Sequence, residues 1–156
     1  MIMDSRLEFC DAVNVFASAG TALVGSQIDT DVIRDLGQGH PLYLVITVAT
    51  GIITGGTAGI IQFKLVSDST ASISTTTSTI HAASEAFVTD DIAAVDTELL
   101  IGATPWVTAL PPEGPEWEQF MGLLVVTTTT TTTAGAINAF LTLDPYGWKS
   151  YADAAN

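Results

Sequence analysis

Carboxylates are the most numerous groups in this sequence that could take part in chemistry. They gather in three stretches, at residues 29–35, 90–98 and 113–118. Paired carboxylates can act as general acid and base in glycoside hydrolysis, and closely spaced carboxylates can bind Ca²⁺. Asp29 and Asp31 have the spacing that starts a calcium loop, but the glycine and the distal glutamate of that loop do not follow. We therefore interpret the three stretches as solvated surface groups, with a calcium site or a catalytic pair as alternatives.

The histidines and the cysteine offer little further chemistry. His40 and His81 are the only histidines, and a zinc site would need carboxylate partners that the spacing does not identify. We interpret His40, beside Pro41, as a surface or capping residue. Cys10 is the only cysteine, so no intrachain disulfide and no thiolate metal site can form. The Gly-x-Ser-x-Gly turn that carries a hydrolase nucleophile is absent.

Two glycine-rich stretches, residues 37–39 and 54–59, raise the question of phosphate binding. A dinucleotide-binding loop opens a helix, whereas Pro41 and a β-branched run follow the first stretch. A P-loop continues with Lys and Ser or Thr, whereas Ile60 and Ile61 follow the second. The sequence therefore predicts no catalytic, cofactor-binding or metal-binding residues, and we expect neither an enzyme nor a cofactor.

The charge balance restricts the partners of the chain. Its 156 residues include 17 Asp and Glu against 4 Lys and Arg, a net charge of -13. Nucleic acid is disfavoured because phosphate binding needs clustered cations, and an anionic membrane surface is disfavoured by the same repulsion. The best apolar run, residues 42–49, is far shorter than the ~20 residues of a membrane helix. The first residues do not read as a signal peptide, so we expect synthesis in a cytoplasm.

The elements that would position these groups read as β-strands. The chain contains 23 threonines, and β-branched residues suit a pleated surface. Ile61, Phe63 and Leu65 alternate with Gln62 and Lys64, which is the two-residue period of a strand with one wet face. We predict strands at residues 27–33, 42–48, 60–66, 72–80, 98–101, 106–110, 120–126 and 136–143. About eight short strands between Gly and Pro turns predict a single all-β domain, a β-sandwich or jelly roll.

Residues 127–133 form a run of seven threonines. Such a run cannot define a pairing register because every position looks alike. We interpret it as the extended end of a hairpin or a loop.

The C-terminal residues are unusually aromatic. Tyr146, Trp148 and Tyr151 lie in the last eleven residues, where a chain is ordinarily polar and frayed. We expect these side chains to dock, either on the core of the same domain or on a neighbouring subunit.

Several ordered blocks together resemble a known family. They are AGAINAFLTLDPYGWKSY (134–151), RDLGQGHPLYLV (34–45), QFKLVSD (62–68), LPPEG (110–114) and GLL (122–124). In their order along the chain these blocks resemble the capsid cement proteins of tailed phages, of the kind first described in a Bordetella phage. The blocks span nearly the whole chain, and none of them is a catalytic signature.

The resemblance implies a structural virion protein. It implies a jelly roll spanning residues 1–156, with an N-terminal arm at about 1–20 and a C-terminal arm at about 144–156. The protein would be made in the host cytoplasm and would then bind the outer surface of an icosahedral capsid, bridging major capsid protein subunits and stabilising the shell. It would also pair with itself, as a homodimer rather than a homotrimer. The negative charge agrees with a position outside the shell, away from packaged DNA.

The expected contacts with partner subunits are apolar, aromatic and basic residues that lie near the ends of the chain or in the matching blocks. The candidate interface residues are Leu7, Phe9, Arg34, Tyr146, Trp148 and Tyr151. Buried aromatic anchors at interfaces commonly cost on the order of 2 kcal/mol or more when truncated.

A carbohydrate-binding β-sandwich, such as an adhesin module, is the alternative from another class. Trp106 and Trp117 lie near acidic loops and could stack on sugars if they were exposed. We favour burial of both tryptophans. A glycan-cleaving enzyme that uses two loop carboxylates is a third hypothesis.

Overall fold

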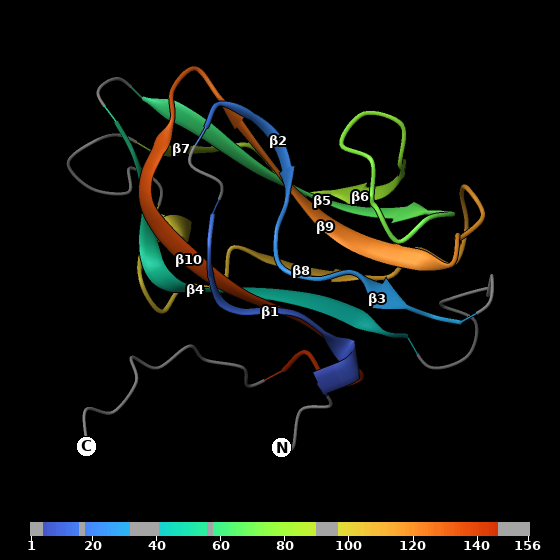
Figure 1. Ribbon diagram of the computed structural model, residues 1–156. Helices are drawn as coiled ribbons and strands as arrows, with labels where there is room; N and C mark the ends of the chain where they lie inside the picture. The colour runs from blue at the N-terminus through green and yellow to red at the C-terminus, as the bar shows by residue number, and fades with distance from the viewer. Residues whose placement is uncertain (1–4, 16–17, 32–40, 56–57, 90–96, 147–156) are drawn as a thin grey trace.

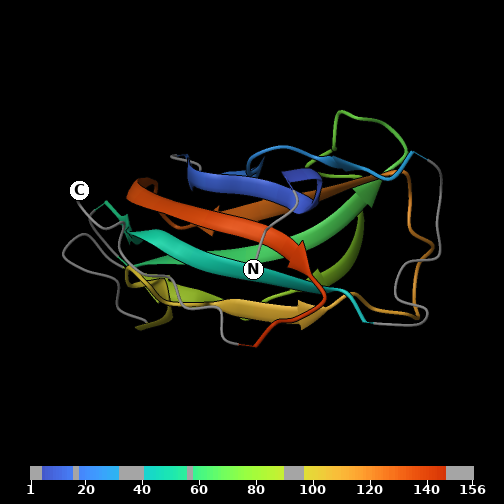
Figure 2. The ribbon, with the colours of Figure 1, turned by 90° about the horizontal axis from the view of Figure 1, so that it is seen from below.

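The chain folds into two antiparallel β-sheets that pack face to face (Figure 1). The computed structural model describes residues 5–15, 18–31, 41–55, 58–89 and 97–146. The first sheet has the order β1 (Glu8–Asn14), β10 (Thr132–Thr142), β4 (Tyr43–Thr54) and β8 (Trp106–Ala109). Figure 2 shows these four strands side by side in that order.

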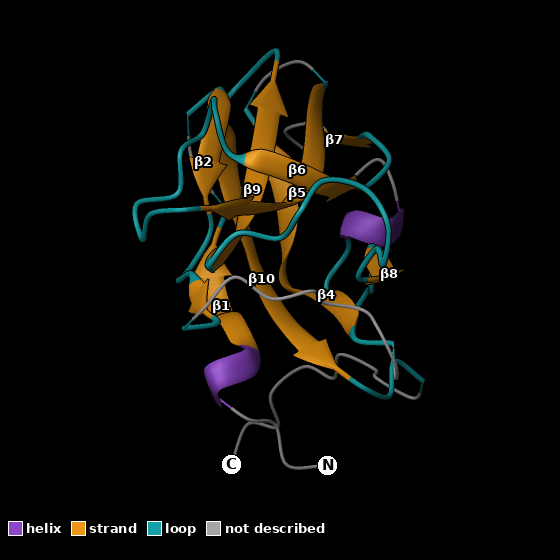
Figure 3. Cartoon of the chain, turned by 90° about the vertical axis from the view of Figure 1, so that its right-hand side faces the viewer, coloured by secondary structure: helices purple, strands orange, loops and turns teal. Residues whose placement is uncertain are grey.

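The second sheet has the order β2 (Gly20–Leu23), β9 (Phe120–Thr128), β5 (Gly59–Asp68) and β6 (Thr79–Ala83). Two short strands extend it: β3 (Ile28–Asp29) pairs with β9, and β7 (Phe87–Thr89) pairs with β5. Two 3-10 helices, η1 (Ser5–Leu7) and η2 (Thr97–Leu99), lie at different edges of the sandwich (Figure 3). The all-β prediction is confirmed, and the described residues contain no helix long and apolar enough to cross a membrane.

The core lies between the two sheets. On β5 the side chains of Ile61, Phe63 and Leu65 are fully buried, whereas Gln62 and Lys64 stay partly exposed. The predicted alternation on this strand is therefore confirmed. Each such side chain contributes about 1.5–3 kcal/mol relative to leaving it in water. The largest fully buried side chains are Phe9, Phe63, Phe87, Leu44, Ile46, Ile52, Ile61, Leu65, Leu99, Leu110, Met121 and Leu123.

A second, smaller apolar cluster covers the opposite face of the second sheet. Val66 and Leu124 point away from the main core and pack with Ile73 from the loop after β5. Asp68 holds this loop, because its carboxylate accepts hydrogen bonds from the backbone N–H groups of Thr70 and Ser74. The predicted strand at 72–80 is therefore wrong over most of its length, since only its last two residues belong to β6.

The threonine run contains a loop that leads from one sheet to the other, so the loop interpretation is confirmed and the hairpin interpretation is wrong, because β9 and β10 do not pair with each other. β9 ends at Thr128, the chain turns, and β10 starts at Thr132 in the other sheet. The connection between β4 and β5 crosses between the sheets at the same end. A hydrogen bond joins the two connections, in which Gly55 N–H donates to the Thr131 carbonyl oxygen at 2.9 Å. The register of the threonines is therefore set by the pairing of β9 with β5 and of β10 with β4, because their identical side chains could not define it.

The structure corrects the sequence prediction at three further places. Residues 98 and 99 belong to η2, and residues 100 and 101 belong to the turn that follows it, so the predicted strand at 98–101 is wrong. Strands β1, β2 and β7 were not predicted. Residues 8–14 lie inside the expected N-terminal arm but pair with β10 as a sheet strand, because Phe9 and Cys10 are core residues.

Candidate functional site

The expected interface residues lie in different environments. Phe9 is only 1% exposed and belongs to the core, so its proposed role as a surface contact is corrected. Leu7 is half-buried and packs against the same core. Tyr146 is 85% exposed, which leaves its ring available to a partner. The other three candidates, Arg34, Trp148 and Tyr151, lie outside the described residues.

Tyr146 belongs to an apolar surface at the end of β10, which we call the β10-end patch. The patch surrounds a cavity of about 410 Å³ lined by Pro41, Tyr43, Leu143, Asp144, Pro145 and Tyr146. Leu143 is 67% exposed, an unusual position for a leucine directly after a central strand. Asp144 orders the turn, because its carboxylate accepts a hydrogen bond from Tyr146 N–H at 3.0 Å. Exposed apolar groups held in a defined shape are typical of a protein contact site.

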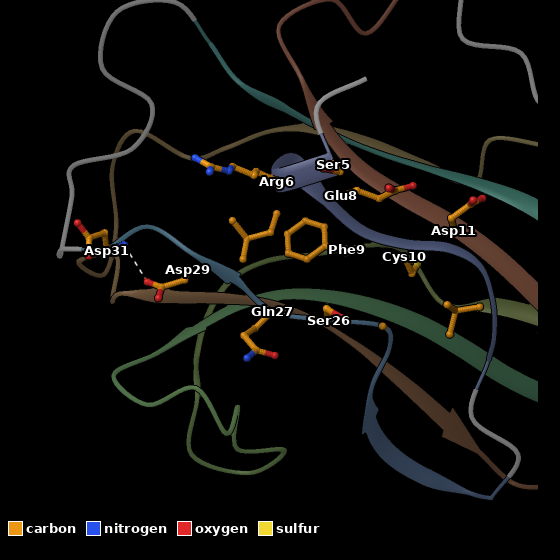
Figure 4. Close-up of a pocket in the computed structure, with 13 residues that line it drawn as sticks. Ser5, Arg6, Glu8, Phe9, Cys10, Asp11, Ser26, Gln27, Asp29 and Asp31 are labelled. Atoms are coloured by element: carbon orange, nitrogen blue, oxygen red, sulfur yellow. Dashed lines mark hydrogen bonds between the residues drawn. The ribbon is translucent and has the colours of Figure 1, made fainter. Parts of the chain in front are cut away.

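A groove runs along the open side of the sandwich beside β1 (Figure 4). Its volume is about 640 Å³, and β1 and the segment 25–31 form its walls. Ser26 N–H donates to the Phe9 carbonyl oxygen at 2.8 Å and ties the two walls together. Gly25 permits this approach, since it has a φ of 69° and a Cβ there would collide with the Phe9 carbonyl. The groove lining is Ser5, Arg6, Glu8, Phe9, Cys10, Asp11, Val13, Gly25, Ser26, Gln27, Ile28, Asp29 and Asp31.

Cys10 borders this groove but is unsuited to nucleophilic chemistry. Its side chain is buried, and its thiol donates to the Ile137 carbonyl oxygen at 3.5 Å. Burial is the main cause that raises the pKa of the thiol to about 12. The reactive thiolate is therefore scarce at neutral pH.

A serine–histidine pair is the arrangement that comes nearest to a catalytic one. The Oγ atom of Ser67 lies 2.7 Å from Nε2 of His81. Ser67 is fully buried, however, and its Oγ also accepts a hydrogen bond from Glu118 N–H at 3.1 Å. A substrate carbonyl cannot reach such an atom, so we interpret the pair as a structural contact. Burial lowers the pKa of His81, and the nearby charge of Glu118 opposes that effect.

Trp106 and Trp117 are the tryptophans that could have offered a platform for sugars. Trp117 is 4% exposed, its ring stacks on His81, and its Nε1–H donates to the Pro111 carbonyl oxygen at 3.4 Å. The expected burial of Trp117 is confirmed. Trp106 is partly buried and packs against the core. Trp117 therefore has no free face of the kind that sugar stacking requires, and the expected burial of Trp106 is confirmed only in part.

The acidic stretches behave as surface groups where the structure describes them. The Asp29 carboxylate accepts hydrogen bonds from Gln119 Nε2 and from Asp31 N–H, and these bonds hold its pKa below the usual range. Within the described part of the chain, no three His, Cys, Asp or Glu side chains are grouped so that they could hold a metal ion. Most of the stretch at 90–98 lies outside the described residues.

Sequence reasoning missed both the groove and the β10-end patch. The groove joins residues 5–13 to residues 25–31, and no local pattern in either segment signals the contact. In the patch, Leu143 looked like the last apolar residue of a strand, yet its exposure becomes visible only in the fold.

Comparisons with known proteins do not identify a family for this chain. No family model matches the chain, and a search of curated proteins finds no significant similarity.

Proposed function

We propose that this protein is a structural component of a phage virion, a cement protein that binds the outer surface of the capsid. It would bridge major capsid protein subunits and pair with a second copy of itself as a homodimer. The β10-end patch is the observation that carries the proposal. This patch lies within two of the sequence blocks that resemble cement proteins, residues 34–45 and 134–151, and it exposes Leu143 and Tyr146 in a fixed turn.

The strand order supports the jelly-roll part of the proposal. β4 pairs with β10 in one sheet, while their chain neighbours β5 and β9 pair in the other. The four strands thus form one long antiparallel ribbon that folds over between β4 and β5 and between β9 and β10. β1 and β2 flank one side of this ribbon, and β8 and β6 flank the other. A double-sheet jelly roll arises from such a wrapped ribbon.

The charge supports a position outside the shell. At a net charge of -13 the protein would be repelled by packaged DNA, and neither nucleic acid nor an anionic membrane is an expected partner. A rigid sandwich without a catalytic arrangement in its described residues suits a mechanical role. Many modest contacts, repeated over the copies on an icosahedral shell, would reinforce it by avidity.

The decisive experiment removes the patch while keeping the fold. The double variant Leu143→Ser/Tyr146→Ser should bind capsids that lack the protein at least about ten-fold more weakly, because two anchors are lost. The matched control is Ile80→Ser/Val88→Ser, which removes two exposed apolar side chains from the other sheet. Equal capsid binding by the patch variant and the unmodified protein would refute the assigned surface.

A second measurement tests the function itself. Capsids assembled without the protein should rupture at a lower temperature than complete capsids, and adding the purified protein should restore their resistance. Capsids of the same strength with and without it would refute the cement function. Sedimentation of the free protein would test the homodimer separately.

A further inference from the structure

The groove beside β1 shares no lining residue with the β10-end patch, and the proposed attachment to a capsid does not involve it. Its shape and its charge therefore need a separate explanation. From these we infer that the groove binds an extended, cationic polypeptide segment of a partner protein. The inference rests on the groove alone and stands whether or not the partner belongs to a capsid.

The shape of the groove favours an extended chain. Its walls are an edge strand of one sheet and the β3 segment at the edge of the other, so the groove follows the seam of the sandwich (Figure 4). The apolar floor is nearly covered, since Phe9 is 1% and Ile28 is 6% exposed. A ligand would meet polar and apolar atoms in similar measure, and the polar ones include the side chains of Ser26 and Gln27, which can pair with an extended backbone.

The charge of the groove selects a cation. Glu8 and Asp11 lie on the β1 side and Asp29 and Asp31 on the opposite side (Figure 4). Among the described residues of the lining Arg6 is the only basic one, so four carboxylates and one guanidinium give these residues a net charge of -3. A strand with Lys or Arg at every second position projects all its cations from one face, so it can turn a dense row of positive charge toward the acidic groove.

Other occupants fit less well. An anion would be repelled, and the nearly covered floor offers little surface to an apolar helix. A second copy of this chain carries the same charge of -13 and only four Lys and Arg residues in all, so it supplies no dense cationic segment. A basic strand from a different protein satisfies both the shape and the charge.

The test uses a labelled peptide of about eight residues with alternating Lys and Thr, which is long enough to follow a strand of β1's length. Its fluorescence anisotropy is titrated with the full chain at about 50 mM salt, where surface charges are weakly screened. We expect saturable binding that weakens at higher salt, and no binding of the same peptide with Gln in place of Lys. Failure of the Lys peptide to bind would overturn the inference.

Two matched double variants separate the groove from the overall acidity. Glu8→Gln/Asp31→Asn and Glu113→Gln/Glu116→Gln each remove two carboxylates, but only the first pair lines the groove. The groove variant should bind the peptide about three- to ten-fold more weakly, and the control should change by less than about two-fold. Equal losses would show that the peptide responds to net charge alone and would overturn the inference.

A steric variant provides an independent check. Ser26→Trp fills the groove without altering its charge and should also weaken peptide binding. Full binding by a folded Ser26→Trp protein would place the peptide elsewhere. Because the assay contains no capsids, its outcome is separate from that of the cement function.

Discussion

The imidazole ring of His81 stacks on the indole ring of Trp117, with centroids 3.6 Å apart and 11° between the planes. His81 Nε2 also meets the Ser67 hydroxyl, whose oxygen already accepts a hydrogen bond from Glu118 N–H. The Ser67 proton is then free to be donated, so the arrangement suits a neutral His81 with Nε2 as the acceptor. In this form His81 ties the connection between β8 and β9 to the edge strand β6.

Mild acid should therefore weaken the fold through His81. Burial lowers the pKa of this group below 6.5 in the folded state, so the unfolded chain takes up the proton first as the pH falls. The stabilising contribution is complete above pH 6.5 and is lost as the pH falls through the folded-state pKa. The pKa values of Asp29 and Asp68 are lowered below 3.8, so those carboxylates stay ionised in this window.

The measurement compares urea midpoints at about pH 7.5 and about pH 5.5, on either side of the unfolded-state pKa. His81→Phe keeps an aromatic ring beside Trp117 but cannot titrate, so its midpoint should change less between the two pH values than that of the unmodified protein. His40→Gln removes the other histidine and serves as the control. An unchanged pH dependence in His81→Phe would contradict the prediction.

Gly135→Ala should destabilise the fold strongly. Gly135 has a φ of 141°, and a Cβ there would lie 3.0 Å from the Ile52 backbone Cα. Gly114 has a similar φ of 124° but no atom near its Cβ position. Gly114→Ala should cost about 1–3 kcal/mol from backbone strain alone, and Gly135→Ala should cost clearly more because of the added collision. Thermal unfolding of the two variants measures the difference, and equal losses would argue against the close packing of β10 on β4.

Thr129→Gly should stabilise the protein. Thr129 lies in the turn between β9 and β10 with a φ of 80°, a conformation that a β-branched residue adopts only with strain. Relief of that strain exceeds the entropic cost of glycine, and we expect a gain of about 0.5–1 kcal/mol in the free energy of unfolding. Thr131→Gly is the control, for which we expect a small loss. A destabilised Thr129→Gly variant would contradict the assigned turn geometry.

The Cys10 thiol should resist alkylation in the native protein. With the side chain buried and its pKa raised to about 12, both access and thiolate are scarce. Labelling with iodoacetamide should be slow in buffer and rapid in denaturant, as followed by mass spectrometry. Rapid native labelling would show that β1 opens from β10 often enough to expose a side chain that the folded protein buries.

The sequence was most informative where strands are regular. The alternation of Ile61, Phe63 and Leu65 identified β5 because that strand buries one face along most of its length. β1 escaped prediction because its register shifts between Glu8 and Cys10 and again between Cys10 and Val13, where Ala12 has a φ of 48°, and these irregularities break the two-residue period. The alternation rule therefore fails where an edge strand is bulged.

The remaining errors and the surface sites depend on tertiary contacts. The β-branched residues at 72–80 suggested a strand, yet Ile73 fills a hollow over Gly122, where a Cβ would come within 3.0 Å of it. Asp68 stabilises the resulting loop. The groove and the β10-end patch depend likewise on residues brought together by sheet order, a relation that local spacing does not encode.

The pairing of β1 with β10 has a consequence for how the protein is made. Among the described strands β10 is the only ladder partner of β1, although residues 8–14 are synthesised far ahead of residues 132–142. At about 5–20 residues per second, roughly 6–25 s separate the two strands during translation. For that interval the apolar side chains of Phe9 and Cys10 lack their final cover. The sheet that holds β1 therefore cannot close before β10 has left the ribosome.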